Sequence, residues 1–166
     1  MLIVEDIAGL DAAGNKASFL QSDVLKVDAT TGTSTVVSDS AAVTFRVQML
    51  DPTPVLGTSA YNDVMLDRYT VSFTRTDGRN TPGVDVPYPF EGALSTLVSV
   101  GSASTISLVV VREVAKLEPP LSRLVDSGAE VVLQTSAKIV FYGHDLANNQ
   151  VTATGYLSVF FANYAE

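Results

Sequence analysis

The sequence of 166 residues contains no cysteine and has few basic residues. Without cysteine there can be no disulfide, no thiolate metal site and no cysteine nucleophile. Ten Lys and Arg side chains stand against 18 acidic ones, giving a net charge of −8, and they form no cluster. Binding to nucleic acid or to an anionic membrane surface needs clustered positive charge, so neither partner is expected.

Long apolar runs are also missing. Typical runs, such as residues 108–111, are far too short to cross a bilayer, so no transmembrane segment is expected. Residues 1–6 have neither a basic region nor a long hydrophobic region. This start predicts that the chain carries no signal peptide.

Apolar residues are nevertheless abundant, at 46%, and Ser and Thr supply much of the remaining polarity. That balance provides a sizeable core and suits half-exposed sheets, where Thr is favoured. The length suits one domain, and we assign residues 1–166 to a single domain.

The clearest pattern lies near the end of the chain, in residues 131–164. Apolar side chains alternate at the end of one run, 131–143, and along the whole of a second, 150–161. Period two indicates extended chain, because successive side chains of a strand point to opposite faces of a sheet. The two runs are joined by a short Asp- and Asn-rich segment, 144–149, which predicts an antiparallel hairpin.

Other segments complete an all-β pattern. Proline, glycine and Asp-Gly signals separate the strands, and one segment favours a short helix because its Pro-Pro pair sits where a helix can start. We expect an antiparallel immunoglobulin-like β-sandwich of about seven to nine strands with one short helical insertion; a closed barrel or jelly roll is the alternative. The expected strands are 2–4, 22–29, 41–49, 68–75 and 105–114, the expected loops or turns 6–16, 30–40, 51–63, 76–80 and 81–92, and the expected helix 117–128.

Two stretches resemble known families. Residues 69–80 run directly into 81–88, and residues 141–155 contain the closing turn. With these stretches the chain resembles an uncharacterised bacterial family of envelope or secreted, lipoprotein-like β-rich proteins. The closing hairpin resembles that of bacterial immunoglobulin-like domains, with Asn148 where their turn usually has Gly. The resemblance implies a β-rich fold and an extracytoplasmic location in the periplasm, at the cell surface or outside the cell. It implies no activity, and this chain lacks the leader and the acylated cysteine of such lipoproteins.

Histidine occurs once, as His144 beside Asp145. A catalytic triad would need a serine and a second acid near it, and no Gly-x-Ser-x-Gly elbow is present in the sequence. We therefore interpret His144 as a surface residue at the mouth of a turn, and expect no catalytic residues and no enzyme.

Calcium is the one metal that the sequence leaves open. Calcium takes six to eight oxygen ligands, and Asp77, Asn80 and Asp85 flank one loop that offers some of them. Similar groups occur in a second loop (Asp145, Asn148 and Asn149) and a third (Asp63 and Asp67). The simpler interpretation is that these residues form turns through their own backbone. No other cofactor is expected.

Several aromatic residues lie where binding is plausible. Tyr61, Tyr88 and Phe90 fall in expected loops, where they would stack on a sugar or another small ligand, or cap the core. Core capping is the preferred interpretation for Tyr88 and Phe90. Tyr142 suits a tyrosine corner, which is a structural role. Tyr156 and Phe160 fall on the exposed face of the last strand and predict a contact with another chain.

These observations favour a non-enzymatic structural or assembly subunit of an extracytoplasmic complex, surface layer or filament. Its expected partners are other protein subunits or further copies of itself. The alternative is a carbohydrate- or small-ligand-binding module that uses the loop aromatics and calcium.

Overall fold

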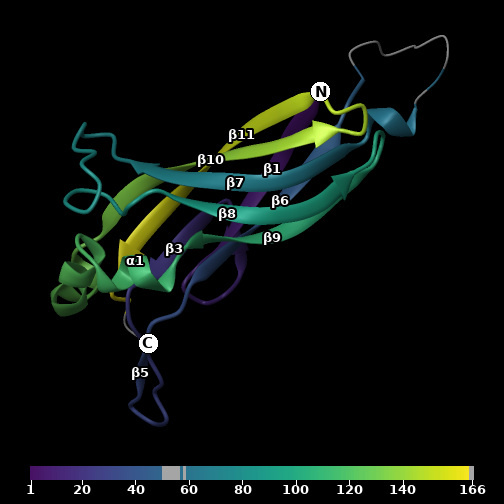
Figure 1. Ribbon diagram of the computed structural model, residues 1–166. Coiled ribbons are helices and arrows are strands. Elements are labelled where there is room, and N and C mark those ends of the chain that lie inside the picture. The colour runs from purple at the N-terminus through teal and green to yellow at the C-terminus, as the bar shows by residue number, and fades with distance from the viewer. Residues whose placement is uncertain (50–56, 58, 165–166) are drawn as a thin grey trace.

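The computed structural model describes residues 1–49, 57 and 59–164. Within them the chain folds as an all-β sandwich of two sheets, as the alternation predicted (Figure 1). Eleven strands are present in these residues, and three of them have only two residues each. The eight longer strands agree in number with the expected seven to nine. The immunoglobulin-like topology stays a prediction.

The larger sheet has five strands and is built around the predicted hairpin. Side chains along both strands of that hairpin alternate between the buried core and an outer face, because each strand has the core on one side only. The alternation runs from Ala137 to Phe141 in one strand and from Leu157 to Phe161 in the other. The strand order is β3 (Phe19–Asp23), β11 (Gln150–Ala162), β10 (Leu133–Asp145), β7 (Val64–Thr74) and β8 (Phe90–Val98).

The smaller sheet packs against the inner side of the larger one. Its central strand, β6, buries Ala41, Val43, Phe45 and Val47 in strict alternation, as predicted for residues 41–49. The strand order is β2 (Lys16–Ala17), β1 (Leu2–Leu10), β6 (Asp39–Val47) and β9 (Ala103–Val111), and β4 (Lys26–Val27) pairs separately with β5 (Ser34–Thr35).

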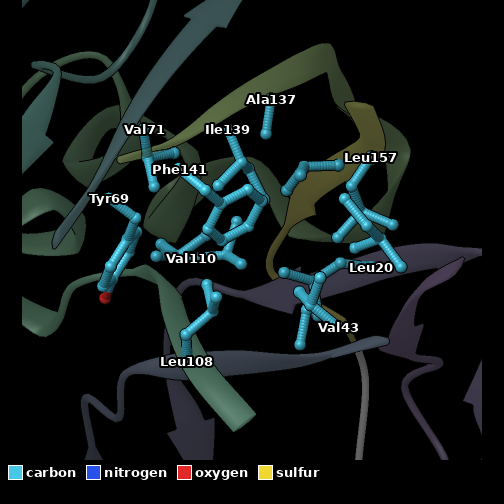
Figure 2. Close-up of a cluster of buried hydrophobic side chains, with 14 of the residues drawn as sticks. Leu20, Val43, Tyr69, Val71, Leu108, Val110, Ala137, Ile139, Phe141 and Leu157 are labelled. Atoms are coloured by element: carbon cyan, nitrogen blue, oxygen red, sulfur yellow. The ribbon is translucent and has the colours of Figure 1, made fainter. Parts of the chain in front are cut away.

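The core lies between the two sheets and is rich in aromatic side chains. Phe141 of β10 meets Phe45 of β6 edge to face, with ring centroids 4.7 Å apart, and stacks on Tyr69 at 6.5 Å. Figure 2 shows Phe141 and Ile139 facing Val110 and Leu108 of the other sheet. The Tyr69 hydroxyl crosses the gap to donate to the Val109 carbonyl oxygen at 3.0 Å. These contacts fix the distance and register between the sheets.

One strand pair departs from the antiparallel arrangement that we expected. β3 runs parallel to β11, with Phe19 beside Ser158 and Asp23 beside Ala162. A parallel pair needs a long connection, and here it is supplied by nearly the whole chain between the two strands. Local pattern carries no information about a pairing of this kind.

The predicted loop at residues 6–16 is partly wrong, because β1 continues to Leu10. A register shift between Val4 and Asp6 interrupts the alternation, so the strand is hard to follow in the sequence. The expected strand at 22–29 is likewise replaced by β3 and β4, with a break between them. The weak edge expected at 30–40 contains the short strand β5 and the start of β6.

The strand β8 has no counterpart among the predicted strands. It begins at Phe90, inside the segment 81–92 that we expected to be irregular. Its exposed positions include Ala93 and Leu97, and its inward positions include Gly92 and Thr96, so polar and apolar residues do not separate by face. The expected loop 51–63 lies mostly outside the described residues, and its described end forms the short 3-10 helix η1 (Ala60–Asn62).

The helical insertion lies between β9 and β10 and consists of two short pieces. α1 (Glu113–Leu117) precedes the predicted helix, and η2 (Leu121–Glu130) follows the Pro-Pro pair, as expected from the position of Pro120. Leu121 and Leu124 of η2 are buried, so η2 packs its apolar side chains against the core. No described helix has the length and apolar character needed to cross a bilayer.

Candidate functional site

The outer face of the five-stranded sheet carries the aromatic residues for which we predicted a contact with another chain. Tyr156 of β11 is 65% exposed. Phe160, four residues further along the same face, is half-buried against Phe19 of β3, with the rings edge to face at 5.7 Å. Lys138 stands opposite Tyr156, and Ser158 stands beside Phe19. We call these five residues the outer patch.

The outer patch is held on rigid backbone. Tyr156 and Phe160 lie in a strand of 13 residues that is paired on both sides, with β10 along its length and with β3 at its end. The Tyr164 hydroxyl donates to the Phe160 carbonyl oxygen at 3.2 Å. Side chains on such a platform lose little conformational freedom on binding, which favours a protein contact.

The loop aromatics do not form one platform. Tyr61 lies in η1, just before β7 begins, whereas Tyr88 precedes Phe90, which pairs with Val71 near the other end of β7 (Figure 1). The seven residue-to-residue steps from Val64 to Val71 separate these ends by roughly 20 Å. A single small ligand cannot bridge Tyr61 and Tyr88.

Phe90 and Tyr88 each pack against their own surroundings. The Phe90 ring lies 6.2 Å from the Tyr69 ring, edge to face, and the Arg112 guanidinium lies over it at 4.6 Å. The Tyr88 ring packs so closely on Gly83 that a Cβ there would overlap it. These contacts agree with core capping, although Tyr88 is half exposed and its use in ligand binding stays a prediction.

The oxygen atoms of the proposed calcium loop already have partners. The Asp77 carboxylate forms ion pairs with both Arg75 and Arg79, and these arginines hold its pKa below the ordinary value, with the Arg75 hydrogen bond as the main cause. Asn80 Oδ1 accepts from the Arg75 amide at 2.6 Å, and Asp85 Oδ2 accepts from the Thr81 amide at 3.2 Å. This arrangement explains the three residues as turn formers, and calcium binding stays a prediction.

Acidic residues elsewhere in the described chain do not gather into a metal site. No three His, Cys, Asp or Glu side chains of residues 1–49, 57 and 59–164 lie close enough together to hold a metal ion. In the closing turn, Asp145 accepts from the backbone amides of Ala147 and Asn149 and from the Asn149 side chain. Asn148 has a φ of 67°, a left-handed conformation that Asn tolerates better than most non-glycine residues.

His144 of β10 lies on the outer face of the five-stranded sheet. Its Nδ1 is 3.0 Å from the Asp67 carboxylate, and both side chains are partly exposed. Among the described residues the imidazole contacts this carboxylate and no hydroxyl nucleophile, which fits the interpretation of His144 as a surface residue. Tyr142 lies nearby under the Arg68 guanidinium, 4.0 Å from the ring centroid, and its hydroxyl has no hydrogen-bond partner in the described chain, so the tyrosine-corner bond is not formed.

A cavity of about 590 Å³ opens at the end of the sandwich where β3 and β6 meet. We did not predict this cavity, because its walls come from separate segments of the chain. These are residues 10–14, 20–26 and 37–40, together with Tyr164. Burial raises the pKa of Tyr164 at its rim. The lining includes Leu10, Gln21, Asp23, Lys26, Asp39 and Tyr164.

A fully buried lysine stands behind this cavity. Lys116 Nζ is 2.7 Å from the Asp39 carboxylate and donates to the Asp23 carbonyl oxygen at 2.7 Å. Ser22 Oγ donates to the same Asp39 carboxylate at 2.6 Å. Each of these polar groups is satisfied within the chain, so the cluster serves to attach α1 to both sheets. In the sequence, the only sign of this buried cluster is a single lysine flanked by apolar residues.

Comparison with known proteins gave no relative. The chain matches no protein-family model, no curated protein and no solved structure.

Proposed function

We propose that this protein is a non-enzymatic structural subunit that assembles with other protein chains outside the cytoplasm. The observation that carries the proposal is the outer patch, where an exposed tyrosine stands beside an aromatic pair on a rigid sheet face. Tyrosine and phenylalanine are enriched in protein interfaces, while lone lysines such as Lys138 suit the rim. The extracytoplasmic location rests on the family resemblance.

The alternative, a module that binds a carbohydrate or another small ligand with calcium, has less support. Its three aromatic residues lie at two ends of the sandwich, and the oxygen atoms of its loop accept hydrogen bonds from the chain itself. We therefore favour assembly.

Photo-crosslinking tests the proposal. A benzoylphenylalanine residue at position 156 should form covalent adducts with another protein chain in cells that produce the protein natively. Position 61 is the matched control, because Tyr61 is exposed to the same degree (68%) but lies outside the outer patch. The absence of adducts at 156, or equal labelling at both positions, would contradict the proposal.

A solution measurement complements the crosslinking. If Tyr156 is a central contact, Tyr156→Ser should weaken association by roughly tenfold or more, as for other interface aromatics. Tyr61→Ser should leave association unchanged. Light scattering over a concentration series measures both.

A further inference from the structure

The turn that follows β7 contains an aspartate directly before a glycine. Gly78 has a φ of 80°, a left-handed conformation that glycine adopts at no steric cost, so the turn favours glycine at this position. A Cβ built on Gly78 would meet no other atom within 4 Å. Neither a side chain of its own nor packing around it therefore shields the Gly78 amide, which follows Asp77 in the chain.

An aspartate before an unshielded glycine amide can rearrange its own backbone. The Gly78 nitrogen attacks Cγ of Asp77, a C–N bond forms, and the carboxyl OH leaves with the amide proton as water. Solvent water then opens the resulting succinimide ring. Cleavage between the nitrogen and the main-chain carbonyl carbon gives isoaspartate, in which the main chain runs through Cγ, whereas cleavage at Cγ restores aspartate. The rearrangement needs no oxidant, reductant or enzyme.

Two conditions control the first step of this reaction. The carboxyl group must be protonated, because an ionised carboxylate is a poor electrophile and has no OH to release as water. Its carbon must also turn toward the glycine nitrogen. Groups that keep the carboxyl ionised and hold both of its oxygen atoms in place therefore oppose the reaction.

Arg75 and Arg79 hold both oxygen atoms of the Asp77 carboxylate. Arg75 Nε donates to Oδ1 at 3.1 Å, and a terminal nitrogen of the same guanidinium donates to Oδ2. Arg79 adds a bond from its Nε to Oδ2 and one from its backbone amide to Oδ1, each at 3.2 Å. Bonds between a guanidinium and a carboxylate are charge-assisted and strong. The carboxylate cannot turn toward Gly78 without losing several of them.

The same contacts keep the carboxyl ionised. The Arg75 hydrogen bond is the main cause that lowers the pKa of Asp77, and the Arg79 backbone and side chain lower it further. Arginine does not lose its proton in proteins, so this effect persists at any pH at which the chain is folded. The Arg75 side chain is only 22% exposed, against 68% for Arg79, so water screens the Arg75 contact less.

We propose that Arg75 and Arg79 protect the Asp77–Gly78 peptide from rearrangement to isoaspartate. The rearrangement adds one atom to the main chain inside the turn. Asn80 Oδ1 accepts from the Arg75 amide across this turn at 2.6 Å, and the added atom disturbs the spacing on which that bond depends. The inference concerns the loop after β7 and not the outer patch, so it does not rest on the proposed function.

Replacement of both arginines tests the proposal. Arg75→Gln with Arg79→Gln should accumulate isoaspartate at position 77 several times faster than the unchanged chain during warm incubation at neutral pH. Incubation in heavy-oxygen water marks the product, because opening of the succinimide ring incorporates a solvent oxygen atom. Peptide mapping by mass spectrometry then locates the label and measures its rate of appearance.

Arg46→Gln with Arg68→Gln is the matched control. These two arginines also pair with carboxylates, and their replacement changes the net charge by the same amount. The control should form isoaspartate at position 77 at the rate of the unchanged chain. Asp126–Ser127 in η2 gives a reference within each protein, and its rate should be the same in all of them. Circular dichroism checks that each variant is folded.

Unfolding gives a second measurement that needs no substitution. In concentrated guanidinium chloride the unchanged chain should rearrange at Asp77 several times faster than in the folded state, because the two arginines are no longer held beside the carboxylate.

Three results would overturn the proposal. The first is an equal rate at Asp77 in the unchanged chain and in Arg75→Gln with Arg79→Gln. The second is an equal acceleration in the control variant, which would show that net charge alone is responsible. The third is a folded, unchanged chain that reacts at Asp77 as fast as the unfolded one.

Discussion

Gly9 shows how one residue permits the closure of one side of the sandwich. A Cβ built at this position would lie 2.8 Å from the Phe19 carbonyl carbon and 2.9 Å from the Leu20 Cα atom. Both are backbone atoms of β3, which is held by its pairing with β11. Glycine is required here for close approach of two backbones.

Gly9→Ala should therefore lower the free energy of unfolding by about 1–3 kcal/mol, the usual cost of overpacking a rigid site. Gly155→Ala is the control, because its added Cβ would meet the end of the Ile7 side chain, which can rotate away. Urea denaturation compares the two variants. A larger loss for Gly155→Ala would show that the β1–β3 crossing can adjust.

Asp145 organises the turn between β10 and β11 through its carboxylate. Hydrogen bonds from the Asn149 side chain, and next from the Asn149 backbone amide, hold the pKa of Asp145 below its ordinary value of 3.8. A carboxylate whose pKa is lowered by folding stabilises the folded state above its unfolded pKa. That stabilisation is lost as the pH falls through the lower folded pKa.

Asp145→Asn should lower the melting temperature at neutral pH, and the difference from the unchanged chain should shrink as the pH falls below 3.8. Asp11, Asp28 and Asp77 also have lowered pKa values, so only the difference between the two proteins isolates Asp145. Thermal melts followed by circular dichroism give this difference. A difference in melting temperature that stays constant with pH would contradict a stabilising role of the Asp145 carboxylate.

At the scale of elements, Lys116 ties the short helix α1 to both sheets. Its ammonium group pairs with Asp39 of β6 and donates to the backbone of Asp23 in β3. Both charges lie largely out of water, and Ser22 satisfies a further position of the carboxylate. Removing one partner of a buried pair leaves the other charge uncompensated.

Lys116→Met should cost about 3–5 kcal/mol of stability. The double variant Lys116→Met with Asp39→Leu should recover part of this loss, because no buried charge remains without its partner. Lys26→Met, at an exposed lysine of β4, should change stability by about 0.5 kcal/mol or less. Chemical denaturation of these three variants, of Asp39→Leu alone and of the unchanged chain tests these values, and additive effects of Lys116→Met and Asp39→Leu would contradict direct coupling of the two residues.

For the whole molecule, net charge should decide how salt affects association. Copies of a chain with a net charge of −8 repel one another, and salt screens that repulsion beyond about 10 Å at 0.1 M. The proposed contact through the outer patch is mainly aromatic and apolar, and salt does not weaken apolar contacts.

Self-association should therefore strengthen several-fold when the salt concentration rises from about 0.05 M to about 0.5 M. Sedimentation velocity at several salt concentrations measures the change. Weaker association at high salt would mean that ion pairs hold the copies together, contrary to a contact through the outer patch.

The sequence by itself determined the fold class and the strands with one buried face. In β6, β7, β10 and β11 the alternation of buried and more exposed side chains is strong, because each of these strands has the core on one side only. The position of Tyr156 on the outer face was predicted for the same reason. These are local properties, which neighbouring residues encode.

The tertiary structure alone decided which distant segments meet. The continuation of β1 to Leu10 is hidden by a register shift, and β8 is hidden because an edge strand does not separate polar from apolar residues by face. The parallel pairing of β3 with β11 and the contact of Lys116 with Asp39 join residues far apart in the chain. Such pairings depend on how two sheets close on one another, and the period of a single strand does not record that geometry.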